Sequence, residues 1–126
     1  MTMTDTNTTG ATTGGASLIS SKDVTGTEVY DMSGENLGHI DHVMIDKQSG
    51  KIAYAVLNFG SFLKMGGEER PLPWSALSYD VDQNGYRVSK TKSDLENAPS
   101  HSGDWHSDRD WEDRTHSHYG ANPYYI

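Results

Sequence analysis

The chain has 126 residues, a formal net charge of −8 at pH 7 and no cysteine. This length accommodates one domain, and the lack of cysteine excludes disulfides, thiolate catalysis and cysteine-ligated zinc or iron–sulfur centres. The acidic balance leaves no basic stripe for phosphate groups, so we expect no direct nucleic-acid binding.

The first residues of the chain are polar, and their composition predicts a disordered tail over residues 1–17. Thr, Asn, Gly and Asp dominate this stretch, which offers too little apolar surface to offset the entropy lost on ordering. It lacks the basic and apolar regions of a secretory signal. No apolar run approaches the roughly 18–20 residues of a membrane span, so we expect a cytoplasmic protein without a transmembrane segment.

Short apolar runs separated by turn residues begin near Leu18 and predict β-strands. The first expected strand is Thr27–Asp31. The next two, Leu37–Lys47 and Lys51–Phe59, are joined by a short glycine-bearing link, which predicts a hairpin. The strand over 51–59 is apolar on both faces and is therefore expected at the centre of a sheet.

The apolar positions of the strand over 37–47 change phase in its middle. Ile40 stands at an even position, whereas Val43 and Ile45 stand at odd ones. A strand alternates its faces with a period of two, so burying all three side chains requires one extra residue. We therefore expect a β-bulge near Asp41 and His42.

The next expected strand, Glu68–Trp74, contains two prolines. Pro71 and Pro73 cannot donate ladder hydrogen bonds, so this strand is expected at an edge of the sheet. A single helical turn is expected directly after it, over Trp74–Leu77.

Two further short elements complete the central region. Tyr79–Val81 and Tyr86–Val88 are expected to pair as a hairpin that turns at Asn84-Gly85. A short helix is expected over Ser93–Ala98, with Ser93 as its N-cap and Glu96 completing a capping box.

Taken together, the elements predict one all-β domain over residues 18–98, built as a barrel or a sandwich. Its expected core consists of the apolar residues Val29, Leu37, Ile40, Val43, Ile45, Ile52, Tyr54, Val56, Leu57, Leu72, Leu77, Val81 and Val88.

Residues 99–126 are rich in His, Asp and aromatic side chains, and predict a flexible tail. We find neither a period of two nor one of 3.6 across its aromatic residues. Trp105 and Trp111 are nevertheless unusual in so polar a segment, and are expected to anchor the tail on the barrel or on a partner.

Five segments of the central region stand in the order and spacing of a known family: Gly26–Asp31, Gly34–Asp46, Gly50–Leu57, Phe59–Leu63 and Pro71–Leu77. On these segments the chain resembles the PRC-barrel family over about residues 18–90. The resemblance implies a small, strongly bent β-barrel of about six strands. The family includes the cytoplasmic domain of the photosynthetic reaction-centre H subunit and the C-terminal domain of a ribosome-maturation factor. Its members share docking to a larger assembly rather than a reaction.

The resemblance and the residues together favour a non-catalytic protein–protein interaction module, docking to a membrane-associated, reaction-centre-like assembly or to a stress-related one. A ribosome- or RNA-associated factor and a metal-responsive or small-ligand-binding protein are the alternatives. No catalytic motif is found in the sequence, so we expect no enzyme and no cofactor. His39 and His42 are interpreted as solvated surface residues, so we expect no metal site.

The partner itself is unknown from the sequence, but two features bear on how it is bound. Phe62, Leu63 and Met65 lie in a glycine-flanked loop, and an apolar group of that size on the surface is typical of an interface. A domain of about eighty residues is marginal when alone, which makes a homo-oligomer a second expectation.

Overall fold

The computed structural model describes residues 17–59, 68–99 and 104–126. The predicted N-terminal tail therefore lies almost wholly outside the described residues. The elements in chain order are α1 (Ser21–Val24), β1 (Glu28–Tyr30), β2 (Asn36–Ile45), β3 (Ile52–Phe59), β4 (Glu68–Pro73), η1 (Trp74–Ala76), β5 (Leu77–Asp80), β6 (Gly85–Val88), α2 (Lys92–Glu96), η2 (Trp105–Ser107) and α3 (Arg109–Tyr119).

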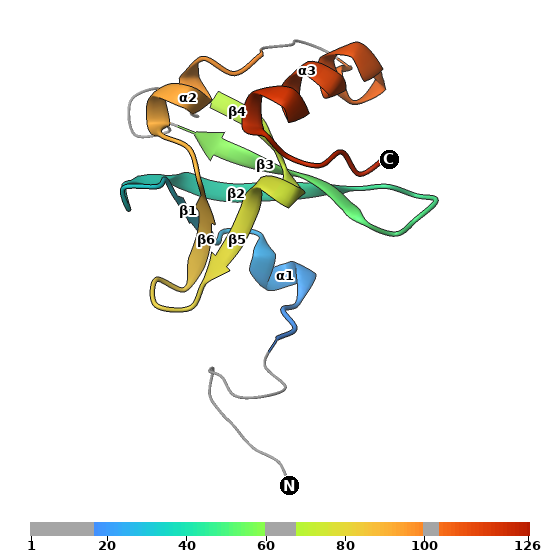
Figure 1. Cartoon of the computed structure of the whole chain (residues 1–126). Coiled ribbons are helices and arrows are strands. Elements are labelled where there is room, and N and C mark those ends of the chain that lie inside the picture. Colours follow the sequence, from blue (N-terminus) through green and yellow to red (C-terminus); the bar gives the residue numbers. More distant parts are fainter. Residues whose placement is uncertain (1–16, 60–67, 100–103) are drawn as a thin grey trace, which may run out of the picture.

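The six strands form one curled sheet with the order β4-β3-β2-β1-β6-β5 (Figure 1). Neighbouring strands are antiparallel except β1 and β6, which are parallel, so the sheet is mixed. Among the described residues no strand pairing joins β4 to β5. The predicted barrel of about six strands is therefore an open half-barrel, and it is accompanied by helices.

The predicted hairpins and edge strand are all present. β2 pairs with β3, β5 pairs with β6, and the proline-containing β4 lies at one edge of the sheet. The predicted helical turn is the 3₁₀-helix η1. The N-cap of helix α2 lies two residues earlier than expected, because Thr91 and Asp94 form the capping box in place of Ser93 and Glu96.

The expected β-bulge lies in the middle of β2. Ile40 faces Leu57 on β3, and His42 faces Val56, so Asp41 is the extra residue. The bulge lets β2 bend while Ile40 stays in the core, as the change of phase predicted.

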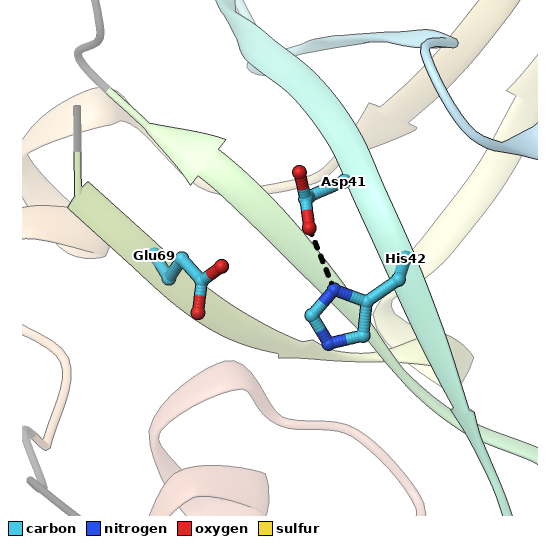
Figure 2. Close-up of side chains that lie close together, drawn as sticks. All are labelled: Asp41, His42 and Glu69. Carbon is cyan, nitrogen blue, oxygen red and sulfur yellow. Dashed lines mark hydrogen bonds and ion pairs between the residues drawn. The ribbon is translucent and has the colours of Figure 1, made fainter. Parts of the chain in front are cut away.

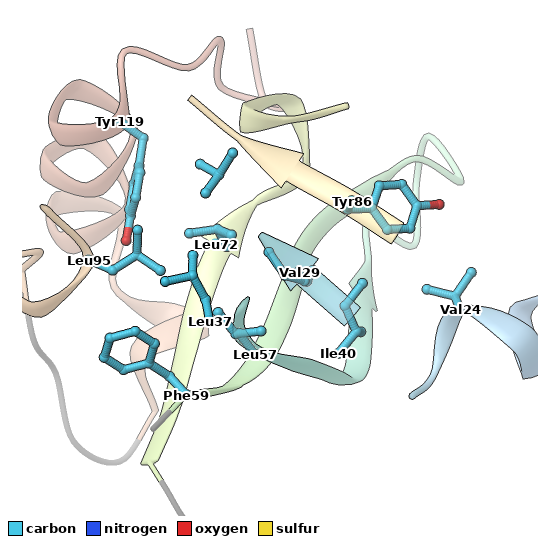
Figure 3. Packing of buried hydrophobic residues seen from close by; sticks show 12 residues of the cluster. Val24, Val29, Leu37, Ile40, Leu57, Phe59, Leu72, Tyr86, Leu95 and Tyr119 are labelled. Carbon is cyan, nitrogen blue, oxygen red and sulfur yellow. The ribbon is translucent and has the colours of Figure 1, made fainter. Parts of the chain in front are cut away.

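Most of the predicted core is confirmed, and two residues are corrected. Ile45 is 57 % exposed, because it ends β2 at the tip of the hairpin, beyond the covered part of the sheet. Val81 is 70 % exposed, because it lies in the turn after β5. The main cluster of buried apolar residues is shown in Figure 3 and consists of Val24, Val29, Leu37, Ile40, Ala55, Leu57, Phe59, Leu72, Tyr86, Val88, Leu95 and Tyr119.

Two glycines allow the backbones of neighbouring strands to approach closely. Gly38 has a φ of +137°, and a Cβ there would lie 2.1 Å from the backbone oxygen of Asn58. A Cβ on Gly85 would lie 2.6 Å from the backbone oxygen of Glu28. The parallel contact between β1 and β6 thus depends on the missing side chain at position 85.

The C-terminal segment is helical, so the prediction of a flexible tail over 99–126 is wrong for its described part. Asp108 caps α3 by accepting a hydrogen bond from the backbone N–H of Trp111, and Gly120 ends the helix with a left-handed φ of 62°. The buried stripe includes Trp111, Thr115 and Tyr119, which follow a spacing of four. The helical period is hidden in the sequence, because the buried stripe also contains polar residues. The other aromatic residues of the segment lie outside the helix and do not follow this period.

Candidate functional site

The residues predicted to bind a partner fall into two groups. Phe62, Leu63 and Met65 lie outside the described residues. Trp105 and Trp111 lie in the C-terminal segment, which packs across β3 and β4 (Figure 1). Trp111 is 1 % exposed and Trp105 is partly buried, and both rings contact Tyr54 of β3. In this conformation the two tryptophans therefore anchor the segment on the chain's own barrel.

A buried carboxylate holds this segment in place. Glu112 of α3 is 3 % exposed and accepts hydrogen bonds from the hydroxyl groups of Tyr54, at 2.8 Å, and Tyr124, at 2.6 Å. The Nε of Arg109 donates a third bond, at 2.9 Å. Burial, and then the bond to Glu112 and its charge, raise the pKa of the Tyr54 hydroxyl far above its ordinary value. A buried carboxylate that accepts hydrogen bonds from three donors typically stabilises the fold.

An open polar cavity of about 400 Å³ lies between the end of this segment and the β2–β3 turn. Several of its polar side chains have partners within the chain. Asp46 accepts hydrogen bonds from the backbone N–H and the hydroxyl group of Ser49, which lower the pKa of its carboxyl group. Arg109 pairs with Glu112 and lies 3.7 Å from the centre of the Tyr125 ring.

The two edges of the sheet differ in how they are protected. β4 carries Pro71 and Pro73 at its edge, and its Arg70 reaches across to the backbone oxygen of Leu95. β5 contains neither proline nor lysine, and among the described residues it has β6 as its one strand neighbour. Prolines are a usual means of blocking an edge strand, and the one charge of β5, Asp80, lies at the end of the strand and near Arg87 of β6. Of the two edges, β5 is therefore the one better suited to accept a further strand.

Apolar side chains are exposed at this same edge. Tyr79 of β5 is 46 % exposed, and Val81, in the turn that follows, is 70 % exposed. The ring of Tyr79 packs edge-on against that of Tyr86, with the centroids 5.2 Å apart, and is thereby held at the surface. We call Leu77–Asp80 together with Val81 the β5 edge.

A second polar group lies on the outer side of β2, β3 and β4. Asp41, His42 and Glu69 each offer one metal-ligating atom, and these atoms lie within 4.8 Å of one another (Figure 2). The Nδ1 of His42 is 2.8 Å from Oδ2 of Asp41. The sequence pattern placed His42 beside His39 and gave no indication of Glu69, which comes from another strand. The bulge at Asp41 was the available signal, because it changes which neighbours share a face.

His116 and His118 of α3 have structural contacts instead. His116 is buried, with its Nδ1 2.8 Å from the backbone oxygen of Glu112. The Nε2 of His118 lies 2.7 Å from the backbone oxygen of Asp94, which ties α3 to α2. The imidazole of His116 also packs against the ring of Tyr54 on β3, so both imidazoles contact elements outside α3.

Comparison with known proteins supports the fold. The family model described as the PRC-barrel domain matches residues 17–95. No curated protein matches the sequence. Among solved structures, the chain is similar to the crystal structure of a protein described as a 16S ribosomal RNA processing protein, RimM, from Pseudomonas aeruginosa. The identity is 22 %, the TM-score is 0.44, and the match covers 60 % of this chain and 45 % of that chain. It thus spans less than half the length of that protein.

Proposed function

The chain belongs to the PRC-barrel family, and we propose that it is a non-catalytic protein–protein interaction module whose docking surface is the β5 edge. The observation that carries this proposal is the contrast between the two edges of the open sheet. One edge is blocked by two prolines, whereas the other presents a free strand beside exposed Tyr79 and Val81.

Strand addition is the form of binding that this edge supports best. An extended segment of a partner can pair with the free backbone groups of an edge strand, and neighbouring side chains then give specificity. Tyrosine is enriched among the residues that dominate binding energy, and Tyr79 is already oriented by its contact with Tyr86. A partner segment with apolar and basic side chains would suit Tyr79, Val81 and the acidic balance of the chain.

The buried carboxylates support a role without catalysis. Glu112 is satisfied by three donors, as described above. Asp31 is also buried, and its Oδ1 accepts bonds from the backbone N–H groups of Ser33 and Glu35 and from the Ser33 hydroxyl group. Burial would raise the pKa of Asp31, but these bonds outweigh it and lower the pKa. Carboxylates held in this way stabilise a turn or a helix rather than transfer protons.

Site-specific cross-linking tests the proposal. A photo-cross-linking amino acid is placed at Tyr79 of the full chain in cells of its source, and cross-linked proteins are identified by mass spectrometry. Ile45 provides the matched control, because it is a similarly exposed apolar residue at the far tip of the β2–β3 hairpin. We expect a discrete protein adduct from position 79 and none from position 45.

The identity of the adduct separates the candidate partners. A membrane-associated or stress-related protein, or a second copy of this chain, would support a docking module, whereas ribosomal proteins would favour the ribosome-associated role. If position 79 gives no adduct, or no more than position 45, the β5 edge is not the docking surface.

A further inference from the structure

We propose that Asp41, His42 and Glu69 form a binding site for a divalent transition-metal ion, with zinc as the ion that fits best. The site lies on the outer side of the sheet and uses none of the residues of the β5 edge. Figure 2 shows the two carboxylates and the imidazole ring directed toward a common space from β2 and β4.

The β-bulge is what brings the first two ligands together. Neighbouring residues of a regular strand point to opposite faces of the sheet. Asp41 is the extra residue between Ile40, which faces Leu57, and His42, which faces Val56. The side chains of Asp41 and His42 therefore lie close enough for their oxygen and nitrogen atoms to be 2.8 Å apart.

The third ligand comes from the strand beyond β3. Glu69 of β4 faces Asn58 of β3, and Asn58 faces His39 of β2. The carboxylate of Glu69 reaches back over β3 toward the bulge. The site thus joins strands that are two positions apart in the sheet, and β3 between them pairs regularly with β4 and through the bulge with β2.

The distances suit a four-coordinate ion after a small adjustment. Zinc–ligand bonds of about 2.0–2.1 Å in tetrahedral geometry place the ligand atoms about 3.3 Å from one another. The three atoms here lie within 4.8 Å of one another, so closure requires side-chain movements of about 1.5 Å at most. All three side chains are at least partly exposed, which allows this movement and leaves a position for water. One imidazole and two carboxylates are ligands that zinc accepts.

The electrostatics of the site also favour a cation. Two carboxylates share this space, and in the part of the chain that the structure describes neither has an ion pair with lysine or arginine. Asp41 instead lies 2.8 Å from the imidazole of His42. A divalent ion would neutralise the repulsion between Asp41 and Glu69.

Zinc titration of the tag-free full chain by calorimetry, after removal of metal with chelator, tests the proposal. We expect a saturable site in the natural protein that His42→Ala and Glu69→Gln each weaken by about tenfold or more. His106→Ala is the matched control, because His106 is an exposed histidine that lies 4.0 Å from the carboxylate of Asp104. This control should bind zinc as the natural chain does.

Two further measurements distinguish the loss of a zinc ligand from misfolding of the variant. Glu69→Gln is close in shape to the original side chain, and its far-ultraviolet circular dichroism should match that of the natural chain. In the natural chain, zinc should shift the NMR signals of the His42 ring before those of any other histidine. The proposal is overturned if the His42 and Glu69 variants bind zinc as tightly as the natural chain, or if another histidine responds first. Neither result would affect the cross-linking test at Tyr79.

Discussion

Replacing Glu112 by alanine should loosen the C-terminal segment from the barrel. This carboxylate joins α3 to Tyr54 of β3 and to Tyr124, and it also accepts a hydrogen bond from Arg109 within α3. The substitution removes the acceptor of three hydrogen bonds but leaves the apolar contact of Trp111 with Tyr54 in place.

The three donors differ in what they can do once the acceptor is gone. Arg109 is exposed and Tyr124 is only partly buried, so both can bond to water. Tyr54 is 2 % exposed, and its hydroxyl group is left without a partner. An unsatisfied buried donor costs about 1–3 kcal/mol, and the small cavity adds to this. Alanine is a slightly better helix former than glutamate, and this offsets the loss of stability by a few tenths of a kcal/mol. We expect the free energy of unfolding to fall by about 2–3 kcal/mol.

Urea unfolding followed by circular dichroism and tryptophan fluorescence measures this loss. Two of the three tryptophans of the chain, Trp105 and Trp111, lie in the C-terminal segment and report its release. Glu96→Ala is the matched control, because Glu96 is an exposed glutamate on α2, and it should change stability by no more than about 0.5 kcal/mol.

A double-mutant cycle identifies the cause of the loss. Tyr54→Phe removes the donor that Glu112→Ala leaves unpaired, so the double variant should be more stable than the sum of the two losses by about 1 kcal/mol. If Glu112→Ala behaves like Glu96→Ala and the cycle shows no coupling, the buried carboxylate does not hold the segment and the reasoning fails.

Two further predictions concern backbone contact and pH. Gly85→Ala should destabilise the fold by more than about 2 kcal/mol in the same urea assay, because its Cβ would lie 2.6 Å from a backbone oxygen of β1; a loss no larger than that of an exposed substitution would contradict this. Burial, and then the bond to Glu112, raise the pKa of Tyr124 to about 12, and burial also raises the pKa values of Tyr54 and Tyr119. Above the ordinary tyrosine pKa of about 10 the unfolded chain releases protons that the folded chain retains, so this contribution to stability should be complete below pH 10 and decline as the pH rises toward 12. Melting temperatures measured from pH 8 to 12 check this, and a constant value above pH 10 would contradict it.

Local sequence patterns were sufficient to predict the strands, their hairpins and the bulge. Period-two alternation and turn residues act between near neighbours, so the hairpins could be predicted without knowledge of the rest of the fold. The change of phase between Ile40 and Val43 located the bulge for the same reason. The prolines of β4 placed that strand at an edge, because a missing N–H group is a property of the residue itself.

The candidate sites could be predicted only in part. The sequence predicted the bulge near Asp41 and His42 but no metal site, and Glu69 joins these two residues only through the pairing of β3 with β4. Likewise, Tyr79 belonged to a predicted hairpin, but its position on a free edge follows from the strand order of the complete sheet.

The sequence by itself determined the family, the local elements and most of the core, because each of these is encoded by residues close together in the chain. Only the tertiary structure decided that the C-terminal segment folds back as α3. Helix α3 contacts Tyr54, which stands 58 positions before Glu112 in the sequence. The buried stripe of α3 is also partly polar. Such a stripe becomes stable only where the facing surface supplies matching donors and aromatic rings, and that match is absent from the segment's own sequence.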